Sequence, residues 1–260
     1  MENFGLVTLP IVAVRSVDNE RSELITQLLF GDIVFILDYT EKWLFIENRE
    51  DSYKGWVDRK MIQPITQQEF EQMIKWSIKR VYRPFSIINN TKTQEKMLIP
   101  AGSALRNFQN GYFQVLDEQW FIDEENFKKS AIEGGELLVD IAQQFLNAPY
   151  LWGGKTVFGI DCSGFVQTVF NIYGINLPRD SSIQIKEGKD IFHLKHAQTG
   201  DLAFFGDSES KITHVGILID NDKIIHASGW VKIETIDSKG IISNKDGQYT
   251  HQLWAIKRVL

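Results

Sequence analysis

The chain has 260 residues, of which 43% are hydrophobic and 24% are charged. This length suggests one or two domains of average size or three small ones, with enough apolar residues for real cores. The formal net charge of −6 argues against nucleic acid or an anionic membrane as the main partner, because both attract basic surfaces. No run approaches the roughly 18 apolar residues of a membrane-spanning helix, so no membrane span is expected.

The N-terminus has no basic segment followed by a long apolar run, so no signal peptide is visible. We therefore expect a cytoplasmic protein, or a secreted or periplasmic one if a leader has been removed. The single cysteine cannot form an intramolecular disulfide, and cysteine usage gives no sign of an oxidising compartment.

Residues 1–63 are predicted to form short strands. β-Branched and aromatic residues dominate these runs and turn residues separate them, as in a small barrel. The expected strands are residues 10–15, 23–32, 33–37, 43–47 and 55–57. The turn at Leu29–Asp32 and the strand at Tyr53–Val57 resemble those of a bacterial SH3-like barrel.

Residues 64–130 are interpreted as a second, diverged SH3-like barrel. Apolar residues at helical spacing predict a helix over residues 66–80. Over residues 96–122, an apolar strand, a glycine turn, a strand and a tryptophan strand then repeat the order of the first segment. The stretch from Lys128 to Gly135 is the expected linker.

Residues 131–260 are predicted to form an α+β domain. An apolar stripe from Leu137 to Leu146 predicts a helix that ends by Pro149, and a second apolar face follows Cys162 and ends at Gly174. The expected strands are residues 201–205, 214–219, 223–227 and 253–258. Helices followed by an antiparallel sheet are typical of this fold class.

Cys162 is the candidate nucleophile. It follows Asp161 at the predicted start of the second helix. A thiol attacks a carbonyl only as the thiolate, and an ordinary cysteine pKa near 8.5 leaves few thiolates at neutral pH. The helix N-terminus is expected to lower this pKa, and the Cys162 N–H can face a developing oxyanion. Gly164 would let the helix start lie close to another backbone.

His214 and His226 lie on neighbouring predicted strands and are the candidate base and its orienting partner. A two-residue turn between these strands would place the two histidines on opposite faces. A three-residue turn at Asp220–Asp222 would pair Gly216 with His226, which places both histidines on one face as diagonal neighbours. We predict the three-residue turn.

Other chemistries are open to the same residues. A lone cysteine is most often an inert buried side chain, and Cys162, His214 and His226 are also three possible zinc ligands. The cysteine at a helix start and the strand placement of the histidines favour a nucleophile. No cofactor is expected.

Six segments of the third region, in order, resemble the NlpC-type family of papain-like cysteine peptidases that cut bacterial cell-wall peptides. They are Pro149–Gly154, Asp161–Val166, Leu177–Ser181, Thr199–Phe205, His214–Ile217 and Ile225–Ser228. With two SH3-like barrels before it, the chain resembles the subgroup of γ-D-glutamyl-L-diamino-acid endopeptidases. This resemblance implies cleavage of the D-γ-Glu to diamino-acid bond in muropeptides that carry a free N-terminal L-Ala.

The resemblance also implies roles for individual residues. Cys162 would be the nucleophile, His214 the base and His226 its orienting partner. Asp161 would meet the free amine of L-Ala. The residues expected to line the cleft are Tyr150, Trp152, Ser163, Arg179 and Ser181, and Tyr150 would also donate toward the oxyanion.

The first barrel would close the non-primed end of this cleft, with Glu23 and Tyr53 as its candidate contributions. A strand-edge acid and a barrel-packing aromatic are equally good interpretations of these two residues. The expected partner is a small cell-wall peptide bound by a monomer. The alternatives are another thiol amidase or acyltransferase on this scaffold, and a cell-wall-binding protein with an inactive peptidase domain.

Overall fold

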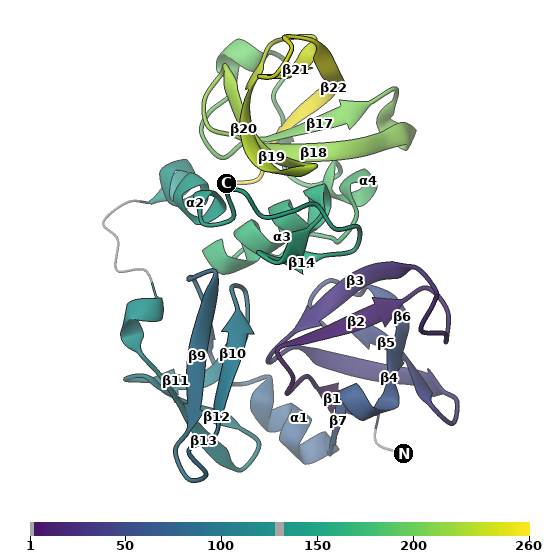
Figure 1. Cartoon of the computed structure of the whole chain (residues 1–260), viewed down its shortest axis with the longest axis vertical. Helices are drawn as coiled ribbons and strands as arrows, with labels where there is room; N and C mark the ends of the chain where they lie inside the picture. The colour runs from purple at the N-terminus through teal and green to yellow at the C-terminus, as the bar shows by residue number, and fades with distance from the viewer. Residues whose placement is uncertain (1–2, 128–132) are drawn as a thin grey trace. The chain divides into compact units, whose positions relative to one another are not determined.

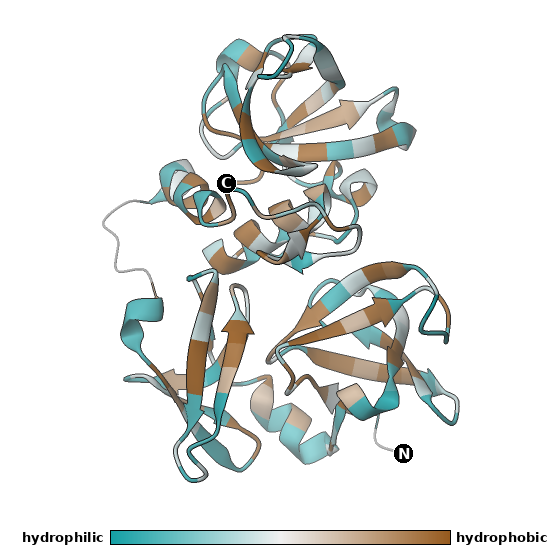
Figure 2. Cartoon of the chain, viewed as in Figure 1, coloured by the Kyte–Doolittle hydropathy of each residue, from teal (hydrophilic) through white to brown (hydrophobic). Residues whose placement is uncertain are grey.

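The computed structural model describes residues 3–127 and 133–260, and the chain divides into two compact units, residues 1–128 and 129–260 (Figure 1). Apolar residues concentrate on the strands of both units and on helix α3 (Figure 2). The expected boundary between residues 63 and 64 falls within strand β7, and the one between 130 and 131 lies outside the described residues. The domain limits therefore stay a prediction.

The first unit begins with a seven-stranded antiparallel sheet in the order β3-β2-β6-β5-β4-β1-β7. Its strands are β1 (Phe4–Leu6), β2 (Ile11–Arg15), β3 (Leu24–Leu29), β4 (Ile33–Tyr39), β5 (Trp43–Asn48), β6 (Lys54–Asp58) and β7 (Gln63–Ile65), with the short helix η1 (Arg59–Met61) before β7. Alternate residues of β2 are buried, as period-two side-chain geometry requires. The five strands expected from the sequence are present, and β1 and β7 are additional.

A six-stranded sheet follows in the same unit, in the order β10-β9-β13-β12-β11-β8. Its elements are β8 (Ile78–Arg80), β9 (Phe85–Asn90), β10 (Lys96–Pro100), β11 (Ala104–Gln109), β12 (Tyr112–Val115), β13 (Glu118–Ile122) and the short helix η2 (Glu124–Asn126). The helix expected over residues 66–80 is shorter, since α1 spans Gln67–Met73 and Ile78 pairs with Arg106 in the sheet. At residues 78–80, backbone pairing with β11 outweighs the helical spacing of the apolar residues.

Buried and half-buried charges join these two sheets. Arg80 is paired with Glu50 and lies 3.9 Å from Asp32, and its Nη1 donates to the Gly102 carbonyl at 2.9 Å. Arg106 is buried and donates to the Gly31 carbonyl at 3.1 Å. The second sheet supplies the arginines and the first supplies the carboxylates, so the charges link the sheets within the first unit.

The second unit begins with helices. They are α2 (Gly134–Gln143), α3 (Cys162–Tyr173) and α4 (Ser181–Gln184), and the two-residue strands β14 (Lys155–Thr156) and β15 (Gly159–Ile160) lie between α2 and α3. Residues 128–132 of the expected linker lie outside the described residues. Gly134 and Gly135 are the first two residues of α2 rather than part of a linker.

The sheet of the second unit closes on itself. Its strands are β16 (Lys189–Asp190), β17 (Leu202–Gly206), β18 (Ile212–Leu218), β19 (Lys223–Ser228), β20 (Trp230–Ile236), β21 (Gly240–Ile242) and β22 (Tyr249–Arg258), with short helices η3 (Leu194–His196) and η4 (Glu209–Lys211). β21 also pairs with β22, so the strands from β17 to β22 form a closed barrel. Helix α3 contacts β18 and β19, which carry the candidate histidines.

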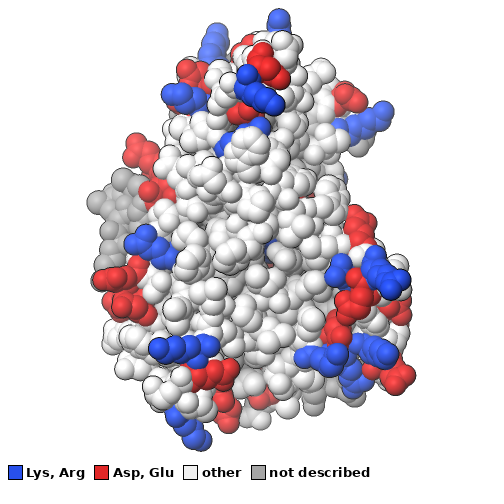
Figure 3. All heavy atoms as spheres, in the orientation of Figure 1, with Lys and Arg blue, Asp and Glu red and all other residues white. Residues whose placement is uncertain are grey.

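The face drawn in Figure 3 carries both signs of charge interspersed, without a large patch of one sign. In the described part of the chain, no helix is both long and apolar enough to cross a membrane.

Candidate active site

Cys162 is the first residue of α3, as the sequence predicts. Asp161 is the N-cap, and its Oδ1 accepts the Gly164 N–H at 2.7 Å. The helix ends at Gly174, which has a φ of 110° and is the expected left-handed cap. A side chain at position 164 would collide with the Gly154 carbonyl oxygen, so the expected close backbone approach at Gly164 is confirmed.

Asp161, Ser163 and Arg179 form one buried cluster behind the thiol. Arg179 donates to both carboxylate oxygens of Asp161, at 3.0 and 2.5 Å, and to Ser163 Oγ at 2.9 Å. Gly153 N–H donates to Asp161 Oδ2 at 2.8 Å. The carboxylate thus accepts two backbone amides and a bidentate guanidinium, which fixes the start of α3 relative to the loop before β14.

The thiol lies in a dry environment. Cys162 is only 6% exposed, and burial and the Asp161 carboxylate raise its pKa to about 11. Backbone N–H groups of Val215 and Ser163 oppose this rise by donating to the sulfur. The expectation of a lowered thiol pKa is therefore wrong for this state, because desolvation outweighs the amides and the helix terminus. A proton acceptor must take the thiol proton as the reaction begins.

The predicted histidine pair is confirmed in register and contact. Ile217 pairs with Ile225, and Ile219 N–H donates to Lys223 O at 2.9 Å, which leaves the predicted three-residue turn between β18 and β19. His214 Nε2 lies 2.9 Å from His226 Nδ1. The Val215 amide donates to the Cys162 sulfur, so the thiol lies beside the strand that carries His214. Because Nε2 of His214 contacts His226, Nδ1 is the ring nitrogen that remains available to the thiol.

Both histidines are held neutral. Burial, and then the charge of His226, lower the pKa of His214 well below 6.5, and burial also lowers the pKa of His226. A neutral imidazole beside a protonated thiol is a resting base and acid rather than a preformed ion pair.

Across residues 3–127 and 133–260, no group of three or more His, Cys, Asp and Glu side chains is arranged to hold a metal ion.

Two residues near the histidines were missed by the sequence analysis. Glu234 Oε2 lies 3.0 Å from His226 Nε2, and the ring of His251 stacks on that of His214 with centroids 4.1 Å apart. Glu234 lies on β20, a strand that was not predicted, and His251 lies on β22 before the expected start of that strand. The apolar–polar alternation from Val231 to Glu234 was the available sequence signal for strand β20.

The predicted cleft residues differ in exposure. Tyr150 and Trp152 are 36% and 60% exposed, whereas Arg179 is 2% exposed. Burial, and then the charge of Cys162, raise the pKa of Tyr150 to about 12, so its hydroxyl keeps its proton at neutral pH. Ser181 is half-buried at the first turn of α4. Tyr150 is therefore close enough to the thiol to sense its charge and can donate a hydrogen bond.

Glu23 and Tyr53 belong to the first unit, at one end of its first sheet. Arg15 at the end of β2 pairs with Leu24 of β3 on one side and Trp56 of β6 on the other. Glu23 and Tyr53 lie just before the starts of β3 and β6, the two strands that flank β2. Glu23 is exposed and Tyr53 is half-buried. Their predicted role toward the substrate stays a prediction.

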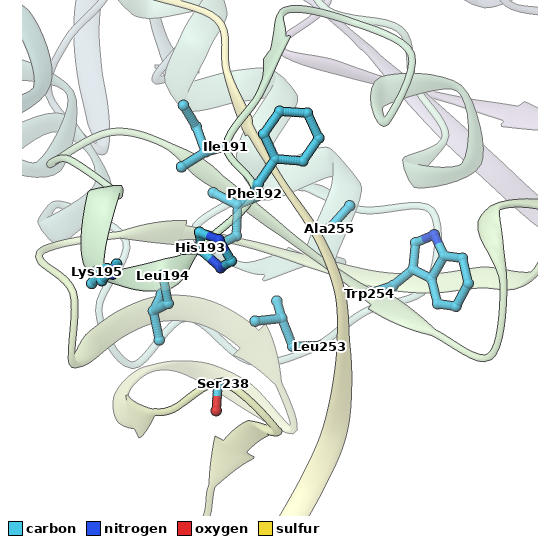
Figure 4. A pocket seen from close by; sticks show the side chains of 10 residues that line it. Ile191, Phe192, His193, Leu194, Lys195, Ser238, Leu253, Trp254 and Ala255 are labelled. Carbon is cyan, nitrogen blue, oxygen red and sulfur yellow. The ribbon is translucent and has the colours of Figure 1, made fainter.

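A separate hollow of about 440 Å³ lies against β22 of the second unit (Figure 4). Phe192, Leu194, Leu253 and Trp254 line it, and none of the predicted site residues does. It is thus distinct from the cysteine and histidine cluster.

Comparison with known proteins identifies the family of this chain. The sequence profile of the NlpC/P60 family matches residues 147–254, and that of the bacterial dipeptidyl-peptidase Sh3 domain matches residues 17–62. A gamma-D-glutamyl-L-lysine dipeptidyl-peptidase of Bacillus subtilis (strain 168) is 30% identical over 249 residues, 90% of this chain and 80% of the relative. The chain belongs to the NlpC/P60 family. A protein of the same name from Bacillus cereus (strain ATCC 10987 / NRS 248) is 27% identical over 87% of this chain and 74% of its own length.

The family fold is also seen in a solved structure. The crystal structure of an NlpC/P60 family protein from Bacillus cereus ATCC 10987 matches 99% of both chains with a TM-score of 0.83 and 21% identity. The expected fold class is confirmed: an SH3-like region precedes a papain-like α+β domain. The predicted membership of a cysteine peptidase family is confirmed as well.

Proposed function

We propose that this protein is a cysteine endopeptidase that hydrolyses the amide bond between γ-D-Glu and the L-diamino acid of cell-wall muropeptides. The substrate carries a free N-terminal L-Ala, and the product is L-Ala-D-Glu. The observation that carries the proposal is the His214–His226 hydrogen bond of 2.9 Å beside a thiol at a helix start. Relatives named gamma-D-glutamyl-L-lysine dipeptidyl-peptidase match most of the chain and support this substrate class.

Acylation starts from the neutral pair. The thiol proton of Cys162 passes to His214 Nδ1 while the sulfur attacks the γ-carbonyl carbon of D-Glu. In this proposal the Tyr150 hydroxyl and the Cys162 N–H stabilise the oxyanion. Protonated His214 then donates its proton to the departing amine of the diamino acid, which leaves a thioester on Cys162.

Deacylation reverses these roles. With the amine gone, His214 is neutral again and removes a proton from water, which attacks the thioester carbonyl. The Cys162 thiolate leaves and regains the proton from His214, and L-Ala-D-Glu is released. In this scheme His226 stabilises the transient imidazolium of His214 in both halves, with its Nδ1, 2.9 Å from His214 Nε2, as the acceptor.

Selection for a free amine is part of the proposal. Asp161 brings negative charge next to the nucleophile, and Glu23 and Tyr53 are the proposed contribution of the first unit. The pairing of Asp161 with Arg179 limits how much charge remains for an ammonium group. A site that pairs a buried amine rejects substrates without one, since its polar groups are then left unsatisfied.

The proposal places a monomeric enzyme in the recycling of muropeptides within the cytoplasm. A free L-Ala amine exists only after the glycan has been removed, which supports a late step in wall breakdown. Light scattering of the purified protein would give the mass of one chain if the enzyme is a monomer, and twice that mass would reject this part.

The test is hydrolysis of L-Ala-γ-D-Glu-diaminopimelate and of its L-Lys counterpart, followed by mass spectrometry. We expect release of L-Ala-D-Glu from the free peptides, and none from copies acetylated at L-Ala. Equal cleavage of acetylated peptides would reject the proposed selection for a free amine but would still support peptidase activity.

Cys162→Ala is the matched control, and it must abolish release. Activity that survives in Cys162→Ala would reject the thiol mechanism. No cleavage of any peptide by the wild-type protein would favour another amide substrate or a wall-binding role instead.

A further inference from the structure

The hydrogen-bonded chain behind the thiol does not stop at His226. Glu234 is 4% exposed, and its Oε2 lies 3.0 Å from His226 Nε2. His226 pairs with Lys232 across β19 and β20, so Glu234 is two residues beyond that partner and on the same face. Three side chains on consecutive strands, His214, His226 and Glu234, are thus linked through both ring nitrogens of the middle one.

The carboxylate fixes the positions of the protons. Glu234 is ionised at neutral pH, because hydrogen bonds from His226 and its neighbours lower its pKa to about 2 despite burial. An ionised carboxylate only accepts hydrogen bonds, so His226 Nε2 carries the proton and Nδ1 is the acceptor. His214 Nε2 must then donate, which leaves His214 Nδ1 without a proton and able to take one from the thiol.

The opposite arrangement would block the reaction. If His226 carried its proton on Nδ1, it would donate to His214 Nε2, and the proton of neutral His214 would reside on Nδ1. That nitrogen could not accept the proton of Cys162. The contact between the two histidines alone fits both arrangements, and the carboxylate of Glu234 distinguishes them.

We propose that Glu234 is a positioning residue that sets the direction of proton donation along His226 and His214, so that the base faces the thiol unprotonated. This inference rests on the thiol chemistry of the proposed function. Glu234 contacts neither the substrate nor the sulfur in this scheme and acts only through the two histidines.

The other groups around Glu234 fit this role. Lys232 Nζ lies 3.2 Å from Oε2 and also sits over the Trp230 ring, and the Asn244 N–H points at Oε1 from 3.3 Å. On the far side, His251 stacks on His214. The positive charge of Lys232 balances the buried carboxylate and disfavours a second proton on His226, which keeps the imidazoles neutral.

Two substitutions separate hydrogen-bond direction from charge. Glu234→Leu removes the acceptor at similar volume, so we expect kcat to fall on the order of 100-fold or more with KM changed little. Glu234→Gln keeps a carbonyl oxygen, which Lys232 holds toward His226 because the ammonium also needs an acceptor there. We expect Glu234→Gln to stay within about tenfold of wild type.

A double variant tests the orientation of the new amide. In Glu234→Gln with Lys232→Met, nothing holds the carbonyl toward His226, and the amide can turn its NH₂ group to Nε2. We expect this variant to lose as much activity as Glu234→Leu, whereas Lys232→Met alone keeps the carboxylate acceptor for His226 and should lose much less than the double variant. Glu187→Leu, an exposed position in the same unit, is the matched surface control and should leave kcat unchanged.

The decisive readouts need no peptide substrate. Nitrogen-15 NMR of labelled histidines reports which ring nitrogen of His226 is protonated, and the rate of Cys162 alkylation by iodoacetamide at neutral pH reports thiol activation. Among the single variants, we expect only Glu234→Leu to carry the His226 proton on Nδ1 instead of Nε2. The same variant should show slower alkylation of Cys162. These results stand even if the proposed muropeptide is not cleaved.

Two outcomes would overturn the inference. One is a Glu234→Leu protein that folds, keeps the His226 proton on Nε2 and alkylates at the wild-type rate. The other is a Glu234→Gln protein that loses as much thiol reactivity as Glu234→Leu while its His226 proton stays on Nε2. Thermal unfolding of each variant identifies any that has simply failed to fold.

Discussion

Each unit of this protein contains an arginine–carboxylate cluster, and the two clusters have different consequences. In the first unit, Arg80 of one sheet pairs with Glu50 of the other. In the second unit, Arg179 pairs with Asp161 directly before the thiol. The chemistry of the pair is the same, and only the second adjoins a nucleophile. An arginine–carboxylate pair alone therefore does not identify a site, whereas one that fixes the start of a helix that carries a thiol does.

Asp161→Ala should be the most damaging of the changes that test this difference. It removes the cap of α3 and leaves Arg179 buried without its carboxylate, which costs about 3–5 kcal/mol of unfolding free energy. Urea unfolding measures this loss, and we expect peptidase activity to fall with it. Asp161→Asn keeps an acceptor for Gly164 and should lose less. A change below about 1 kcal/mol in Asp161→Ala would show that the cluster does not hold the helix start.

Acid should weaken the second unit selectively. All five histidines follow residue 190, so the first unit has none. His214 and His226 have lowered pKa values, so below about pH 6.5 the unfolded chain binds protons that the folded one does not. Their stabilisation is complete above that pH and is lost as the pH falls, by about 1.4 kcal/mol per histidine per pH unit.

Denaturant unfolding at pH 6.5 and 5.5, with a probe in each unit, measures this effect. His226→Asn removes one titrating group, so the unfolding free energy of the second unit should depend less steeply on pH. A larger acid-induced loss in the first unit than in the second would contradict the assignment.

Glu50→Ala tests the other cluster. Arg80 then keeps the Gly102 carbonyl and the more distant Asp32, so we expect a loss of about 1–3 kcal/mol of unfolding free energy. Hydrolysis per folded molecule should be unchanged, because this cluster contains no group of the proposed mechanism. A large fall in kcat with intact folding would mean that the two clusters are not functionally distinct.

The smallest expected effect concerns the start of α1. Thr66 accepts the Glu69 N–H at 3.3 Å and Glu69 accepts the Thr66 N–H at 2.7 Å, which forms a capping box. Thr66→Ala should lower the unfolding free energy by about 1 kcal/mol and leave kcat alone. Thr66→Ser, which keeps the hydroxyl, should restore most of it. Comparison of this cap with that of Asp161 separates the cost of a cap from that of a buried ion pair.

Local signals predicted much of the site. The Asp-Cys-Ser-Gly order predicted the thiol at the first residue of α3. The three-residue turn between β18 and β19 predicted that His214 and His226 share one face of the sheet. Strand β20 was missed, and Glu234 with it, since its burial depends on pairing with β19 and β21. Ile78 was assigned to a helix, because no residue in its own segment indicates that it pairs with β11.

From the sequence alone we predict a nucleophile, a base and its partner, because caps, turns and strand alternation depend on neighbouring residues. The protonation of these groups depends on the tertiary structure. Burial makes the thiol a weak acid and keeps the imidazoles neutral, and a carboxylate from the next strand completes the chain behind them. Desolvation and cross-strand contacts depend on everything packed around a group, and segments distant in sequence supply most of that surrounding.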